Sequence, residues 1–201
     1  MNFLGHLYFS DNDIPLMHAN LYGDFVKGSN LDHLTSEIKL GVLLHRNIDH
    51  YIDHHAAVIE LMHSLYPRLP KVTGIAIDLF FDHLLAKNWS QFHALPFHKF
   101  LENFYAYDIS DSSHYSKEFK DFCFVLKSNN WMLHYESLYG LRKMCEGVSS
   151  RISFDNELHH APIIFNEFQN SIESTFFAFM TDAESYFQKT RNELKLQLLN
   201  K

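Results

Sequence analysis

The sequence contains little proline and glycine, with 5 and 7 residues of these types in a chain of 201. β-Sandwiches and barrels need many tight turns, which these two residue types supply, so the shortage argues against both architectures. Only two cysteines are present, Cys123 and Cys145, and their spacing forms no metal motif. We interpret them as reduced thiols of a cytosolic protein rather than as a disulfide framework.

The sequence also lacks a long hydrophobic run and an excess of positive charge. No stretch approaches the roughly 18 apolar residues that indicate a membrane-spanning helix. The N-terminal segment is apolar but short, lacks a basic region and becomes acidic at Asp11, so we expect no signal peptide. The net charge is -7 and the pI is near 6.1, whereas a nucleic-acid binder would be basic. We therefore expect a cytoplasmic protein with neither membrane nor nucleic acid as a partner.

Three common catalytic signatures are missing from the sequence: the Gly-x-Ser-x-Gly elbow, the glycine-rich phosphate loop and the GxGxxG motif. Their absence argues against a serine nucleophile and against nucleotide binding through a P-loop.

Apolar residues recur at helical spacing along most of the chain, and no segment alternates clearly between apolar and polar residues. Thr35 or Ser36 offers an N-cap for a helix that should run to about Asp53. Pro162 interrupts the pattern before a final amphipathic segment. We therefore expect one all-α domain, a helical bundle spanning residues 1–201. Further helices are predicted from Pro15 to about Gly28, over 55–66, 72–89, 131–139 and 141–148, and from Pro96.

The helix predicted up to Asp53 carries metal-capable side chains at four-residue steps, namely His45, Asp49 and Asp53. Residues four apart lie on one face of a helix, and imidazole and carboxylate are good ligands for Mn²⁺, Mg²⁺ or Zn²⁺. A strict four-residue step drifts from the helical period, so two neighbours fit one ion better than all three. The alternative is a solvated polar face that continues through His54 and His55.

A second group, Asp78, Asp82 and His83, lies within a strongly apolar segment. Burying these side chains without partners would cost several kcal/mol, so a cation or a positive side chain must compensate. We favour a metal, and the alternative is a structural pair between a buried aspartate and an arginine such as Arg46.

Two further candidates are weaker when taken alone. Asp24 follows Gly23, and a glycine lets the backbone come close to a ligand or another helix, but such an aspartate is more often a turn residue. His6 in an apolar stretch is more often a satisfied core histidine than a ligand. We interpret most of the 15 histidines as polar residues on exposed helix faces. The clusters together favour a metal-assisted hydrolase.

Several short motifs, taken in order, resemble the acyl carrier protein phosphodiesterase family over about residues 1–151. Each motif is weak singly, and the ordered set carries the resemblance. The motifs are Met1–Leu4 with His6, Gly23–Gly28, Leu44–Arg46 with Ile48 and Asp49, Asp53–His55, Asp78 with Phe81–Ala86 and Trp89, and Trp131, Met132, Tyr135, Gly140, Leu141 and Arg151.

The resemblance implies a helical fold distantly related to the HD-type phosphohydrolases. It also implies hydrolysis of the phosphodiester that joins 4′-phosphopantetheine to a serine of holo-acyl carrier protein. The implied cofactor is a divalent metal, with Mn²⁺ as the first choice and Mg²⁺ or Zn²⁺ as alternatives.

Within this activity we assign roles to the metal-capable residues as a hypothesis. Asp78 and His6 should orient the ligands, Arg46 or Lys27 should hold the phosphoryl oxygens, and Asp53 is a candidate to accept the proton of the attacking water. Most of the ligands, or the groups that support them, should come from Asp24, His45, Asp49, Asp82 and His83. We also count Asp24 as a catalytic residue.

Acyl carrier protein is acidic, as is this chain, so their association requires a local basic patch. Candidates for the patch are Lys27, Arg46, Arg142, Lys143 and Arg151. Two other functions stay open. One is a metal phosphohydrolase acting on a small phosphodiester or a nucleotide, and the other is a non-catalytic helical protein that binds a carrier protein or metal.

Overall fold

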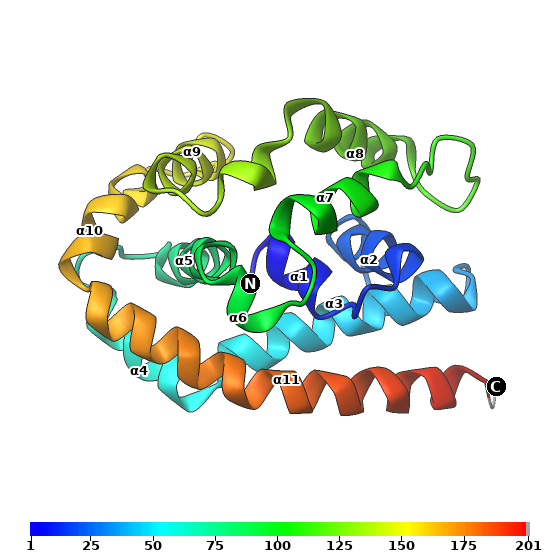
Figure 1. The fold of residues 1–201 in the computed structure, drawn as a ribbon, viewed down its shortest axis with the longest axis horizontal. Helices are drawn as coiled ribbons and strands as arrows, with labels where there is room; N and C mark the ends of the chain where they lie inside the picture. The colour runs from blue at the N-terminus through cyan, green and yellow to red at the C-terminus, as the bar shows by residue number, and fades with distance from the viewer. Residues whose placement is uncertain (200–201) are drawn as a thin grey trace.

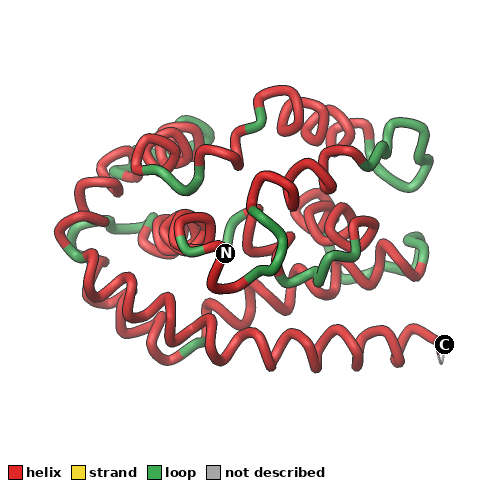
Figure 2. Tube along the Cα trace, in the orientation of Figure 1, coloured by secondary structure: helices red, strands yellow, loops and turns green. Residues whose placement is uncertain are grey.

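The computed structural model describes residues 1–199, and within them it contains helices and loops but no strand (Figures 1 and 2). The prediction of an all-α fold is confirmed. No helix of this part of the chain combines the length and the apolar character that crossing a membrane requires. The helices and 3₁₀ turns are α1 (Phe3–Tyr8), α2 (Ile14–Leu21), η1 (Tyr22–Phe25), α3 (Ser36–His54), α4 (Ala56–Leu65), α5 (Thr73–Lys87), α6 (Trp89–Phe92), α7 (Phe97–Ala106), α8 (Lys117–Asn129), η2 (Trp131–His134), α9 (Leu138–Ser149), η3 (Leu158–His160), α10 (Ala161–Glu167) and α11 (Gln169–Leu199).

Helix α5 lies near the middle of the molecule and contacts α1, α4, α9 and α11 (Figure 1). Most of its residues are buried, which explains why its sequence is apolar on nearly every face. The long helix α11 runs along one edge against α3 and α4, and α2 covers another side of α3. This arrangement places the N-terminal helix α1 between α2 and α5.

The core is rich in aromatic rings, as the composition indicates. Phe81 of α5 lies 5.4 Å, between ring centroids, from both Phe176 and Phe179 of α11, and Phe80 contacts Phe165 of α10 at 5.3 Å. All five side chains are fully buried, and each contributes about 1.5–3 kcal/mol by leaving water. These contacts hold α5 in place, and α5 in turn supports α1.

Several predicted boundaries are confirmed and others are wrong. Helix α3 begins at Ser36, and the Thr35 side chain accepts a hydrogen bond from the Ile38 amide, as an N-cap does. The helix predicted to reach Gly28 already ends at Leu21, where the chain tightens into η1.

The continuous helix predicted over 131–139 is also wrong, because the chain forms only the 3₁₀ turn η2 there before α9 begins. Pro162 does interrupt the pattern, but it stands in the first turn of α10, where its missing N–H costs nothing.

Candidate active site

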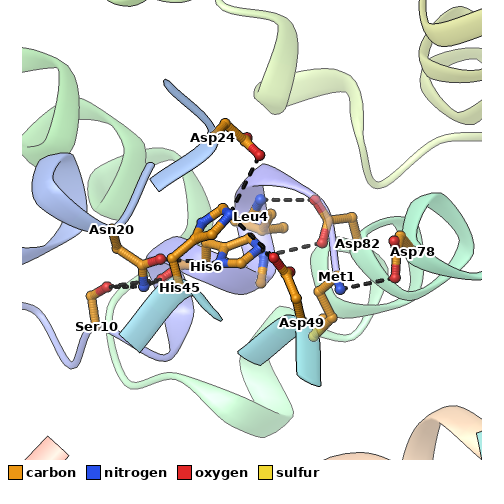
Figure 3. A network of polar contacts seen from close by, with 11 residues as sticks. Met1, Leu4, His6, Ser10, Asn20, Asp24, His45, Asp49, Asp78 and Asp82 are labelled. Carbon is orange, nitrogen blue, oxygen red and sulfur yellow. Dashed lines mark hydrogen bonds and ion pairs between the residues drawn. The ribbon is translucent and has the colours of Figure 1, made fainter. Parts of the chain in front are cut away.

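Three segments bring four metal-capable side chains together (Figure 3). His6 comes from α1, Asp24 from η1, and His45 and Asp49 from α3. The Nε2 atoms of His6 and His45 each lie 3.2 Å from one oxygen of Asp49, and the His45 Nε2 lies 3.4 Å from Asp24 Oδ1. Both imidazoles are almost fully buried, whereas about half of each carboxylate side chain faces solvent. The cluster is therefore open on its acidic side.

Local sequence explains why these segments approach so closely. His45 and Asp49 are four residues apart on α3 and share one face of the helix. A Cβ atom on Gly23 would overlap the His45 ring, so only glycine lets η1 lie against this histidine. Gly41 allows the same close approach between α3 and the backbone of Ala19 in α2. The role expected for Gly23, close approach to another helix, is confirmed.

Buried polar groups hold the His6 ring in one orientation and one tautomer. The Asn20 amide donates to the His6 carbonyl at 2.9 Å and to the Ser10 hydroxyl oxygen at 3.0 Å, which directs Asn20 Oδ1 toward the ring. His6 Nδ1 lies 3.0 Å from that oxygen and must donate to it. The proton therefore sits on Nδ1, and Nε2 presents its lone pair to Asp49.

The two histidines of the cluster differ in pKa and therefore in charge. Burial lowers the pKa of His6 and outweighs the opposing effect of Asp49, so its ring is neutral at pH 7. Burial also lowers the pKa of His45, but the hydrogen bonds that its ring donates to Asp24 and Asp49 outweigh this effect and raise the pKa to about 9. Burial alone would raise the pKa of Asp49, yet the hydrogen bond that it accepts from the charged His45 ring holds that pKa well below its usual range. The His45 ring thus holds a proton that a cation binding at Nε2 would displace.

Asp82 lies behind the cluster, and Asp78 lies beside it and lines the cavity described below without joining the cluster. Both oxygens of the buried Asp82 accept hydrogen bonds from backbone amides of α1, Leu4 at 2.8 Å and Gly5 at 3.0 Å. Burial raises the pKa of Asp82 to about 7, against the lowering effect of these amides and of the N-terminal ammonium. Asp78 lies 2.9 Å from the Met1 ammonium group. The two aspartates therefore anchor the start of α1, the helix that carries His6.

The remaining predicted residues have other partners. His83 Nδ1 donates to the Tyr135 carbonyl at 2.7 Å, and the ring packs edge-on against Phe165, so the structure does not bring it to the cluster. Asp53 is exposed one turn beyond Asp49 on α3. Its side chain does not line the cavity described below.

The two cations expected to hold phosphate contact the backbone around Asp24 instead. Arg46 donates to the carbonyls of Val26 and Gly28 at 3.2 and 2.7 Å, and Lys27 donates to the Asp24 carbonyl at 3.3 Å. The alternative of a buried pair between Arg46 and an aspartate is therefore wrong within the described residues. Arg46 instead stabilises, through these hydrogen bonds, the backbone of the segment that follows Asp24.

A cavity of about 250 Å³ opens beside the cluster, and its walls include His6, Asp24 and Asp49. Asn2, Phe3 and Val148 line this cavity and also line a larger groove of about 530 Å³ along α9. The sequence analysis missed Asn20 and Ser10, because isolated polar residues carry no spacing signal. The available signal was their apolar surroundings, which require a partner for any buried polar group.

Comparisons with known proteins identify the family of the chain. No solved structure matches the chain, so the expected relation to HD-type phosphohydrolases stays a prediction. An acyl carrier protein phosphodiesterase of Photorhabdus laumondii is 28% identical over 75% of this chain and 77% of its own length. The protein of that name from Klebsiella pneumoniae strain 342 is 29% identical over 75% of this chain and 79% of its own, and the one from Enterobacter sp. strain 638 is 26% identical over 89% and 93%. The family model "Acyl carrier protein phosphodiesterase" matches residues 1–183. The chain therefore belongs to the acyl carrier protein phosphodiesterase family.

Proposed function

We propose that this protein is a metal-dependent phosphodiesterase that releases 4′-phosphopantetheine from holo-acyl carrier protein and leaves apo-acyl carrier protein. Its family makes it a phosphodiesterase whose substrate is the carrier protein. The dependence on a metal is our inference from the cluster around Asp49.

One observation supports the metal above the others. His6 donates through Nδ1 to Asn20, so its Nε2 lone pair faces an oxygen of Asp49 at 3.2 Å. A lone pair and a carboxylate oxygen repel each other at this distance unless a proton or a metal ion lies between them, and burial disfavours a second proton on His6. The available ligand atoms of His6, His45 and Asp49 all lie within 4.8 Å of one another, and this mixture of imidazole and carboxylate suits Mn²⁺ or Zn²⁺.

His6, His45 and Asp49 would hold the ion, and the half-exposed Asp24 lies within reach of it. A divalent ion at this place would neutralise charge on the phosphoryl oxygens and lower the pKa of a bound water. The carboxylate of Asp24 lines the cavity and can accept the proton of that water. Asn20 keeps the His6 tautomer that binding requires. Arg46 supports the segment after Asp24 through the carbonyls of Val26 and Gly28 and does not line the cavity.

A second group of possible ligands is far less suitable. Glu157, His159 and His160 also have ligand atoms within 4.8 Å of one another, but all three are exposed. Such a group holds its side chains loosely, because exposed side chains lose rotamer freedom when they coordinate an ion. The buried cluster around Asp49 is therefore the proposed metal site.

The test combines elemental analysis of the purified protein with an assay for release of apo-acyl carrier protein. Activity should disappear on chelation and return with Mn²⁺, Mg²⁺ or Zn²⁺. His45→Gln should lose both metal and activity, whereas the matched variant His50→Gln, on the exposed face of the same helix, should keep both. Full activity in His45→Gln or in metal-free protein would refute the proposal.

A parallel assay with bis-p-nitrophenyl phosphate separates the competing functions. Hydrolysis of this small diester without release from holo-carrier protein would favour a general metal phosphohydrolase. Bound metal with turnover of neither substrate would favour a non-catalytic binder.

A further inference from the structure

A groove of about 530 Å³ runs along α9 and meets the metal-capable cavity. Its size falls in the range of about 300–1,000 Å³ that is usual for small-molecule sites. Asn2, Phe3 and Val148 line both, so the groove and the cavity lie next to each other. The groove is therefore within reach of a molecule that reacts at the cluster.

The chemistry of the groove is mainly apolar and aromatic. Its walls include Trp131, Tyr135, Tyr139 and Met144. Trp131 is 39% exposed and Tyr139 is 54% exposed, and aromatic rings left open to solvent in this way are typical of binding surfaces. Glu146 is the only carboxylate among the lining residues, and Lys143 pairs with it at 2.7 Å. The groove therefore suits an uncharged chain with apolar and amide groups.

Positively charged side chains lie in the walls of the groove and next to it. Lys143 and Arg151 line the groove, and Arg142 lies over the Tyr139 ring at 5.6 Å. Three of the five predicted basic residues thus lie along or just beyond α9, next to the groove. An acidic protein that inserts a neutral arm would meet these cations as the arm enters.

We propose that this groove binds the pantetheine arm of holo-acyl carrier protein, with the phosphate at the cluster around Asp49 and the arm along α9. The proposal rests on the proposed function and deepens it. Pantetheine is uncharged and carries two amides, a dimethyl group and a thiol, which match the aromatic and amide lining. The groove thereby explains how the enzyme distinguishes its substrate from other phosphodiesters, since binding of the remote arm orients the reacting phosphate.

Gly147 offers a way to fill the groove without disturbing the fold. It lies in α9 and lines the groove, and a Cβ atom at this position would meet no heavy atom within 4 Å. Gly147→Leu should therefore place its side chain in the groove. Leucine also has a higher helix propensity than glycine, so the substitution should not weaken α9. Ser174→Leu is the control and adds the same side chain to an exposed position of α11.

The experiment compares kcat/KM for holo-acyl carrier protein in these variants. Gly147→Leu should lose on the order of 100-fold, because a displaced arm misplaces the phosphate, while its metal content and helical circular dichroism stay unchanged. Ser174→Leu should stay close to wild type. Wild-type activity in Gly147→Leu would overturn the groove assignment and leave the proposed function standing.

A binding measurement tests the groove without turnover. The chain has two tryptophans, Trp131 in the groove and the buried Trp89. The tryptophan fluorescence that disappears in Trp131→Phe therefore comes from the groove. Pantetheine, which lacks the phosphate, should quench this emission in wild type but not in Gly147→Leu. Quenching in a protein that releases no apo-carrier protein would support the groove and refute the proposed function, and the absence of quenching in wild type would overturn the groove.

Discussion

The imidazole rings of His6 and His45 are stacked, with 4.2 Å between their centroids and 18° between their planes. Each ring directs its Nε2 to a different oxygen of Asp49. Two positive charges would repel each other across this stack, which agrees with a raised pKa for His45 and a lowered pKa for His6. One carboxylate shared by two imidazoles thus creates a place for one cation.

The shared carboxylate is the first target for mutation. Asp49→Asn should lower both metal content and release of apo-carrier protein by more than about 100-fold, because losing a group behind a ligand already costs about 10- to 100-fold. Asp53→Asn is the matched control, since Asp53 is exposed one turn further along α3. Activity assays and elemental analysis check both variants. If Asp53→Asn were the inactive one, the proton acceptor would be Asp53 and the arrangement proposed here would fail.

Asp82 should matter for stability as well as activity. In Asp82→Asn one of the two amides of α1, Leu4 or Gly5, loses its acceptor in a fully buried place. We expect a loss of about 1–3 kcal/mol in the free energy of unfolding, measured by urea titration, with reduced activity because α1 carries His6. The control is Thr181→Ala on the exposed face of α11, which should hardly change the urea concentration at the midpoint of unfolding. An unchanged midpoint in Asp82→Asn would contradict the anchoring role.

The two helices that meet at Gly23 leave no space for a side chain. Gly23→Ala should destabilise the protein by about 1–3 kcal/mol through overpacking and displace the His45 ring, which its Cβ would overlap. Gly74→Ala in α5 is a matched control, because the nearest atom lies 4.0 Å away and alanine favours a helix. Thermal unfolding and metal content report on both variants. Equal behaviour of the two variants would show that the close approach at Gly23 is not required.

His18 should make stability depend on pH. Burial lowers the pKa of its ring to about 4, although the hydrogen bond to the Ile14 carbonyl opposes this. In the unfolded chain the pKa is about 6.5, so between pH 6.5 and 4 the unfolded state binds more protons and acid destabilises the fold. The contribution of His18 should amount to at most about 3 kcal/mol across this window. Urea titrations at pH 6.5 and 4.5 should show a smaller loss in His18→Gln than in wild type or His50→Gln, and equal losses would exclude His18 as the cause.

The helical architecture could be predicted from the sequence because it follows from local chemistry. Helix α3 shows this well: its apolar spacing, the N-cap at Thr35 and the four-residue step from His45 to Asp49 all depend on neighbours in the chain. The boundaries that were wrong lie at η1 and η2, where contacts with distant segments decide the backbone. A Cβ atom on Gly23 in η1 would overlap the ring of His45 on α3, for example, and no local pattern reveals such a contact.

The sequence by itself determined which side chains were capable of binding metal, because residue type and spacing settle that property. Only the tertiary structure decided which of them meet. It turned Asp82 toward the amides of α1 and His83 toward Tyr135, and it brought His6 to Asp49 instead. The physical reason is that a buried polar group takes the partner that packing places within reach, and packing depends on all the helices at once.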